Sequence, residues 1–228
     1  MSSRHFVPAF ALASLSLLLG ATPVRSATAA TIQVTNCNDT GANSLRDAVA
    51  RAASGDTVSM TLLACNRISL SHGPIVIAQN DLTLRGRDRT VTLHGRDTTQ
   101  VLRHTGTGTL TIQGLVIAHG HNEGLQALGG CVYTAGNLDV RYSRIHHCVA
   151  SGVGEDNVAA GGAVYVQRNA LLSGSVLDDN AVTFDGPAST RCVAAVAVPT
   201  LVGGSPPSIA TSYATPHPGM AAASARTR

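Results

Sequence analysis

Two histidines and an aspartate occupy equivalent positions in three similar segments of the sequence. His119, His147 and Asp179 each follow an aliphatic residue by two positions: Ile117, Ile145 and Leu177. If these segments stack as neighbouring strands, the three side chains form a column with a spacing of about 4.8 Å. Two imidazoles beside a carboxylate could serve as the acid/base groups of an enzyme or bind a divalent metal. The simpler alternative is a hydrogen-bonded ladder of turn residues, so we assign no metal and no cofactor.

Two long segments follow this column and supply further candidate residues. Residues 121–128 and 150–160 are expected to form long loops on one edge of the stack, and they carry Glu123 and Asp156. Long loops on a rigid scaffold are a common place for binding and catalysis. One hypothesis is therefore a carbohydrate-active enzyme, a polysaccharide lyase or hydrolase, with its site on the loops at 119–128 and 150–160.

Arginines are crowded between residues 85 and 103, and Arg85, Arg87 and Arg96 are the candidate binding residues among them. Guanidinium groups bind carboxylates in bidentate fashion, so this cluster could hold an acidic polysaccharide or a cell-surface glycan. Asp88 and Asp97 lie among the arginines and cancel part of their charge, which favours solvated turn residues as the alternative. The formal net charge of only +3 gives no reason to expect nucleic acid as a partner.

Internal repeats predict the elements that position these residues. Gly130-Cys131-Val132-Tyr133 aligns with Gly162-Ala163-Val164-Tyr165 at an offset of 32, and Leu110 aligns with Leu138 at an offset of 28. Short strands with apolar residues two apart alternate with turns from residue 56 to about residue 182. Such units cannot bury their apolar side chains alone, whereas a stack of them can. We therefore predict an all-β fold, a parallel β-helix, over residues 57–182.

The composition agrees with stacked short strands. Apolar residues make up 44% of the chain, but aromatic residues only 3%, and there are 23 glycines. Columns of small aliphatic side chains need no aromatic bulk, so this composition suits a solenoid core. The few aromatic residues disfavour modules that stack rings on a sugar or a base.

One helix is predicted, over residues 44–53. Its apolar residues fall on one face: Leu45, Ala48, Val49 and Ala52. Ser44 is placed to cap its first turn, and Gly55 follows its end. Within an amino-terminal cap of residues 30–56, this amphipathic helix is expected to cover the open end of the stack.

The same helix carries a motif that resembles a known signature. Residues 43–49 (Asn-Ser-Leu-Arg-Asp-Ala-Val) and residues 55–58 (Gly-Asp-Thr-Val) resemble the Cys-Ser-Leu-Arg-Glu-Ala-Ile and Gly-Asp-Thr-Ile elements of exported bacterial β-helix proteins of the CSLREA type. Asn43 and Asp47 replace the cysteine and the glutamate of that signature. The pairs Gly129-Gly130 and Gly161-Gly162 resemble the repeats of this group and of polymorphic outer-membrane proteins. The resemblance covers about residues 31–182 and implies a right-handed, pectin-lyase-like β-helix on a secreted or surface protein. Members of this group mostly lack an established enzymatic activity.

The amino terminus predicts export. Arg4 precedes an apolar run from Ala9 to Gly20, and small residues follow near position 29, so residues 1–29 are expected to be a signal peptide. No later apolar stretch is long enough to cross a membrane. Export favours disulfides, and we predict the pairs Cys37–Cys65 and Cys131–Cys148, with Cys192 left over.

Residues 183–228 lack the repeat pattern and are rich in alanine, serine, threonine and proline, so we predict a disordered tail. We also expect a truncation or a change of reading frame near residue 187. The function that fits these features is an exported β-helix scaffold, without enzymatic activity, that contacts glycans or mediates adhesion at the cell surface. The carbohydrate-active enzyme is the alternative, and the oligomeric state stays open.

Overall fold

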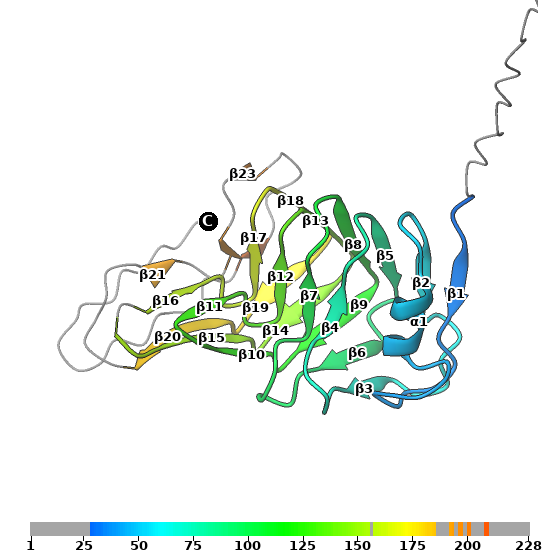
Figure 1. The fold of residues 1–228 in the computed structure, drawn as a ribbon, viewed down its shortest axis with the longest axis horizontal. Coiled ribbons are helices and arrows are strands. Elements are labelled where there is room, and N and C mark those ends of the chain that lie inside the picture. The colour runs from blue at the N-terminus through cyan, green and yellow to red at the C-terminus, as the bar shows by residue number, and fades with distance from the viewer. Residues whose placement is uncertain are drawn as a thin grey trace, which may run out of the picture.

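The computed structural model describes residues 28–155 and 157–185, together with the backbone of four short strands between residues 192 and 209. It shows a right-handed parallel β-helix in which each turn of the chain, here called a rung, contributes one strand to each of three parallel sheets. Figure 1 shows the rungs stacked side by side, with the single helix at the amino-terminal end. The predicted fold is confirmed.

The three sheets of the stack are built from strands that are far apart in sequence. Sheet 1 contains β1 (Thr31–Gln33), β2 (Thr57–Ser59), β5 (Leu82–Arg85), β8 (Thr109–Gln113), β13 (Asn137–Arg141), β18 (Asn169–Ser173) and β23 (Thr200–Leu201). Sheet 2 contains β3 (Arg67–Ser69), β6 (Val91–His94), β9 (Leu115–Ala118), β14 (Arg144–His146), β19 (Val176–Asp178) and β24 (Ser208–Ile209). Sheet 3 contains β4 (Ile75–Ile77), β7 (Leu102–His104), β12 (Val132–Thr134), β17 (Val164–Val166) and β22 (Val196–Ala197).

The core consists of columns of aliphatic side chains that run through the stack. In sheet 1, Leu84, Ile112, Val140 and Leu172 occupy the same register position in successive rungs, and all four are buried. Sheet 2 contributes a second column: Leu93, Ile117, Ile145 and Leu177. Because the strands are parallel and in register, each side chain packs on its counterpart one rung away.

One buried position in sheet 3 is polar and fully hydrogen-bonded. The imidazole of His104 lies inside the stack, where its Nε2 donates to the carbonyl of Gln79 (2.8 Å). Thr134, one rung further, places its hydroxyl 2.7 Å from His104 Nδ1 and also accepts from the amide of Gly136 (3.1 Å). The network satisfies the groups that burial removes from water.

The amino-terminal helix covers the first rung, as predicted. Helix α1 (Leu45–Arg51) begins after Ser44, whose hydroxyl accepts from the Asp47 amide, and it buries Leu45, Ala48 and Val49. At the end of the helix, the backbone carbonyls of Val49 and Ala52 accept hydrogen bonds from the side-chain amide of Gln79. The helix ends at Arg51 with Ala52 as its C-cap, before the glycine that was expected to end it.

Two further three-stranded sheets project from the stack between sheets 2 and 3, and we call them together the fin (Figure 1). Outgoing strands form the first: β10 (His121–Gly124), β15 (Val149–Val153) and β20 (Ala181–Asp185). Returning strands form the second: β11 (Gln126–Leu128), β16 (Val158–Ala160) and β21 (Cys192–Val193). The prediction of long loops here is wrong, because residues 121–128 and 150–160 consist mostly of these strands. The small residues Ala127, Ala150 and Ala159 pack in a core of their own between the two sheets.

A narrow neck of glycines joins the fin to the stack. Gly129 and Gly161 have φ angles of +72° and +67°, which favour glycine. A Cβ added at Gly130 would lie 2.2 Å from the Gly162 carbonyl oxygen and 2.6 Å from the backbone of Val149. The repeated glycine pairs therefore allow the returning chain of one rung to pass close to the outgoing chain of the next.

The predicted end of the β-helix at residue 182 falls within β20, which continues to Asp185. The backbone of β21, β22, β23 and β24 extends four sheets by one further strand each. The predicted signal peptide and the predicted disordered tail otherwise fall on residues outside the described part of the chain.

Candidate functional site

The three predicted acid/base residues occupy the same turn in successive rungs. His119, His147 and Asp179 follow the sheet 2 strands and have φ angles of +53°, +53° and +52°. The imidazoles of His119 and His147 stack with 5.0 Å between ring centroids and 15° between ring planes. No hydrogen bond or ion pair joins Asp179 to either ring. The structure therefore brings together two of the three predicted residues.

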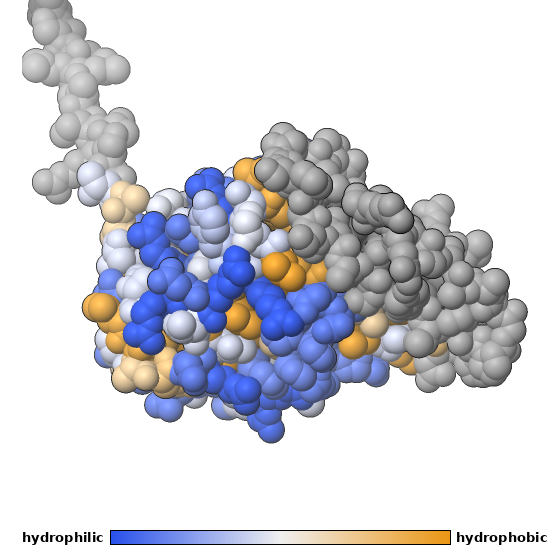
Figure 2. Space-filling model, turned by 180° about the vertical axis from the view of Figure 1, so that it is seen from behind, coloured by the Kyte–Doolittle hydropathy of each residue, from blue (hydrophilic) through white to orange (hydrophobic). Residues whose placement is uncertain are grey.

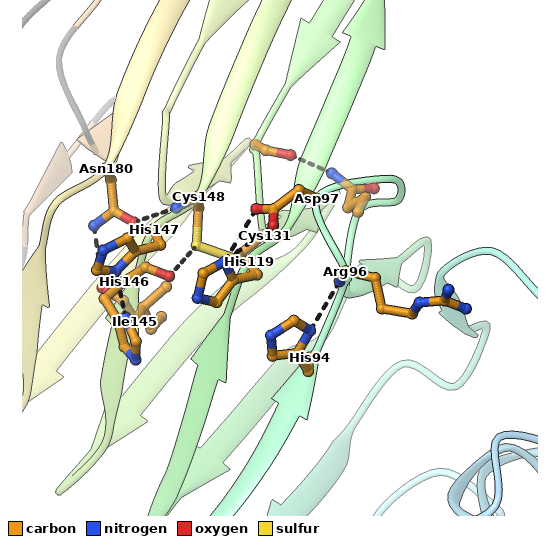
Figure 3. The surroundings of a disulfide bond; sticks show 12 residues. His94, Arg96, Asp97, His119, Cys131, Ile145, His146, His147, Cys148 and Asn180 are labelled. Carbon is orange, nitrogen blue, oxygen red and sulfur yellow. Dashed lines mark hydrogen bonds and ion pairs between the residues drawn. A yellow bond between two sulfur atoms is a disulfide. The ribbon is translucent and has the colours of Figure 1, made fainter. Parts of the chain in front are cut away.

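Two more histidines complete what we call the histidine cluster: His94, His119, His146 and His147. The ring of His94 stacks on His119 at 4.5 Å, so His94, His119 and His147 form one continuous stack across three rungs (Figure 3). His146 meets His119 and His147 edge-on, and its Nδ1 lies 2.7 Å from His147 Nδ1. Ala118, in the same register column of sheet 2 as His94 and His146, is almost completely buried.

The carboxylate that binds the cluster is Asp97. Both of its oxygens lie 3.1 Å from His119 Nδ1, and its backbone carbonyl accepts from His121 Nδ1 at 3.2 Å. An imidazole held by a carboxylate at one nitrogen can act as a general base through the other. Such a pair was expected here, but with Asp179 as its carboxylate.

Burial and neighbouring positive charges act on the cluster. Burial lowers the pKa of His94, and the nearby His119 and Arg67 add to this effect. Burial likewise lowers the pKa of His146, helped by Arg144 and His147. Both imidazoles therefore resist protonation more than a free histidine does. Within the described residues, no three histidine, cysteine, aspartate or glutamate side chains are arranged to hold a metal ion.

An open cleft of about 360 Å³ lies beside the cluster, at the step where the fin projects beyond the preceding rung. Its walls include polar side chains from the turn before β7, from β7 itself and from β10: Thr98, Gln100, Arg103, His121, Asn122 and Glu123. Gln100 is only 5% exposed, and its side-chain amide donates to the carbonyls of Leu128 and Gly129. Glu123, a predicted binding residue, lies 3.7 Å from His121 in this cleft.

Arg103 is the charged group of the cleft that has no counter-ion. Its guanidinium lies over the ring of Tyr133, with 4.7 Å from Cζ to the ring centroid. It forms no ion pair and no hydrogen bond with any of the described residues. Tyr165 stacks on the other side of Tyr133, at 6.0 Å and 1°. The ring therefore holds the guanidinium in place and leaves its N–H donors open.

The predicted arginines are less available than Arg103. Arg85 donates to Gln113 and Arg87 to Thr90, while Arg96 points away from the histidine cluster (Figure 3). None of the three lines the cleft. Asp156, the remaining predicted binding residue, lies outside the described residues.

Sequence reasoning placed Arg103 in the arginine-rich segment but did not select it as a binding residue, although part of the signal was present. The offset of 32 that aligns the glycine pairs also places Tyr165 directly above Tyr133, and the Cα register adds Arg103 below it. The repeats therefore predict the Tyr133–Tyr165 part of this column, whereas Arg103 aligns with Tyr133 at an offset of 30, which differs from both repeat offsets.

Both predicted cysteine pairs are joined. Cys37–Cys65 has a Cα–Cα distance of 6.4 Å, and Cys131–Cys148 one of 5.3 Å. The second disulfide lies at the neck of the fin, because Cys131 directly follows Gly130 and Cys148 directly precedes Val149. It also lies beside the histidine cluster, since Cys148 follows His147 (Figure 3). Cys192 lies in β21, where only the backbone is described.

Hydrophilic side chains predominate on the described surface opposite to the view of Figure 1, with small apolar patches between them (Figure 2). In the described part of the chain, no helix has the length and apolar character needed to cross a membrane. No family model, no curated protein and no solved structure matches the chain. The fold and the site geometry therefore carry the functional conclusion.

Proposed function

We propose that this protein is an exported β-helix scaffold that contacts glycans at or outside the cell surface without transforming them. The observation that carries the proposal is the open guanidinium of Arg103 in a polar cleft. A pre-oriented guanidinium binds carboxylate and hydroxyl oxygens well because little freedom is lost on binding. Gln100, Asn122 and Glu123 add amide and carboxylate groups that suit the hydroxyls of a sugar.

Two further features support an exported scaffold. The chain contains two disulfides, which are typical of oxidising compartments. Its amino-terminal motif resembles that of exported β-helix proteins of the CSLREA type, and its fold resembles the pectin-lyase-like β-helix. The stacked rungs position β7 and the turn before it, which form one side of the cleft.

A glycan array tests this function. The recombinant chain and its Arg103→Gln variant would be applied to neutral and acidic glycans. We expect at least one glycan to be retained, and retention to fall about tenfold or more in the variant, since hydrogen bonds to charged groups contribute about 1.5–3 kcal/mol. Arg87→Gln, on an arginine outside the cleft, is the matched control and should bind like the parent. If no glycan binds more tightly to the parent than to Arg103→Gln, glycan contact through this cleft is wrong.

The enzyme alternative has one specific observation in its favour, the contact between His119 and Asp97. If the protein is a polysaccharide lyase or hydrolase, incubation with an acidic polysaccharide should release products, and His147→Ala should abolish the release. Retention of the glycan without any product supports the scaffold.

A further inference from the structure

The histidine cluster lies at the joint between the stack and the fin. His119 and His147 are two residues before β10 and β15, which are outgoing strands of the fin. The Cys131–Cys148 disulfide lies directly beside them (Figure 3). The glycine neck adjoins this disulfide, because Gly130 directly precedes Cys131. Any change in the spacing of these rings therefore acts on the fin strands that follow.

The contacts of His94 are those of a neutral imidazole. Ring centroids along the stack are 4.5 Å and 5.0 Å apart, and His94 Nδ1 accepts from the amide of Arg96 (3.0 Å), which requires an unprotonated nitrogen. Imidazolium ions at these distances would repel one another, since unit charges about 4 Å apart interact by several kcal/mol near a protein surface.

The surrounding charges do not offset that repulsion. Three arginines and two carboxylates act on the cluster: Arg67, Arg96, Arg144, Asp97 and Asp178. A third carboxylate, Asp179, acts on Arg144. Asp97 binds His119, but Asp178 is held by Arg144 in a two-point ion pair (2.9 Å for Nε to Oδ1). With four protonated imidazoles, the positive charges would outnumber the negative ones by more than two to one.

Among the described residues, the fin has a much smaller apolar core than the main stack to resist this force. Its described core is a separate group of three alanines and one valine, joined by Phe184, whereas the main stack buries long columns of leucine, isoleucine and valine. Segments with few buried apolar contacts open at low free-energy cost. The cleft has β10 as one wall, so displacement of the fin changes the cleft.

We propose that the histidine cluster is an acid-sensitive joint: below about pH 6.5 its protonation loosens the fin and opens the cleft. A ligand held at neutral pH is then released in acid, and this second step rests on the proposed function. The lowered pKa values of His94 and His146 show that the folded cluster resists protonation, so acid shifts the equilibrium toward the opened form.

Hydrogen–deuterium exchange of the full chain tests the joint without any ligand. Amide protection in β10, β15 and β20 would be compared at about pH 7.5 and about pH 5, after correction for the chemical exchange rate, with β8 and β13 of sheet 1 as the internal reference. We expect protection in the fin to fall severalfold in acid, while the reference strands stay protected.

Variants separate the joint from general acid sensitivity. In His94→Gln/His146→Gln, the two imidazoles whose protonation the folded chain resists are absent, so the acid effect should disappear. His119→Asn/His147→Asn removes the neighbouring rings at positions whose positive φ asparagine tolerates, and it should reduce the effect. His72→Asn, at a histidine outside the cluster, should respond like the parent.

Three results would overturn the joint. The parent could show no loss of fin protection in acid, both double variants could lose as much fin protection as the parent, or the strands of sheet 1 could lose protection together with the fin. The glycan array at neutral pH is independent of all three. If the array finds no ligand but the fin still opens, the proposed function fails and the joint stands.

Discussion

The buried network of His104 and Thr134 shows how one hydroxyl can decide the stability of a rung. Thr134 Oγ1 serves two partners, His104 Nδ1 and the Gly136 amide, and neither can reach water. Thr134→Val keeps the shape and removes the hydroxyl. We expect it to lower the free energy of unfolding by about 1–3 kcal/mol, measured by urea denaturation, because two buried groups lose their partner.

Thr134→Ser is the matched control for this network. Serine retains the hydroxyl and loses only a methyl group, so its loss should be about 1 kcal/mol. If valine is tolerated as well as serine, the hydrogen bonds of Thr134 contribute nothing to stability.

Gly130 is the residue at which the neck of the fin allows no side chain. The atoms that an added Cβ would meet belong to the backbone of Gly162 and Val149, which cannot rotate away. We expect Gly130→Ala to cost about 3 kcal/mol in urea denaturation, at the upper end for overpacking. Gly124→Ala, in open space within the fin but at a φ of +148°, should cost only about 1 kcal/mol. Equal losses in both variants would contradict a tight neck.

Part of the candidate site could be predicted from residue spacing. The offset of 28 placed His119 and His147 together correctly. His94 was missed because it aligns with Ala118 at an offset of 24, since the turn between β5 and β6 is longer than the single glycine between β8 and β9. Asp97 was missed for the same reason. A search with constant offsets cannot find partners across turns of different length.

Among the elements, the amino-terminal cap depends on one carboxylate. Asp39 accepts from Arg46, from the amide and hydroxyl of Ser71, and from the amide and ring of His72. Burial alone would raise the pKa of Asp39, but these hydrogen bonds outweigh it and hold the pKa well below its usual range. The bonds tie the segment before α1 to the turn before β4.

Asp39→Asn is expected to weaken this cap. At neutral pH the variant should lose about 2–4 kcal/mol, because Arg46 and the Ser71 and His72 amides lose a charged acceptor. A carboxyl with a lowered pKa stabilises the fold above its unfolded pKa of 3.8 and loses that effect as pH falls below it. The difference in Tm between parent and variant should therefore shrink below about pH 3.8.

The exposed Asp47 provides the control for the cap. Its carboxylate binds Asn43 and Arg51 at the surface, so Asp47→Asn should change Tm much less than Asp39→Asn. A pH-independent difference between the parent and Asp39→Asn would show that the charge of Asp39 is not what stabilises the cap.

The fin is the element that the sequence pattern did not reveal. Its strands β10, β11 and β16 are rich in alanine, glycine and polar residues, which have weak strand propensity, and large apolar residues do not recur along them at two-residue spacing. They form strands because each stacks on its counterpart in the next rung. The main sheets were predictable because leucine, isoleucine and valine recur at two-residue spacing, whereas context overrides propensity in the fin.

At the scale of the whole molecule, the ionisable groups predict two separate losses of stability in acid. The first comes as pH falls below about 6.5, because the unfolded chain binds protons at His94 and His146 that the folded chain resists. The second comes below about pH 3.8, where Asp39 and Asp178, whose pKa values are lowered in the fold, take up protons.

Circular dichroism melts at closely spaced pH values would check this profile. We expect Tm to fall in two steps, and only the upper step to vanish in His94→Gln/His146→Gln. A single fall near pH 4 in the parent would mean that the histidines bind protons equally well in the folded and unfolded chain.

The stack and the fin tip differ in how they can accommodate evolutionary change in chain length. The starts of β10 and β11 are five residues apart, and those of β15 and β16 are nine, so the tip holds all four residues by which the offset grows from 28 to 32. The core columns on either side keep their register. Insertions at this tip can thus alter the surface beside the cleft while the scaffold stays intact. Lineages could diversify there at little cost, and an experimenter could graft a foreign peptide at the same place.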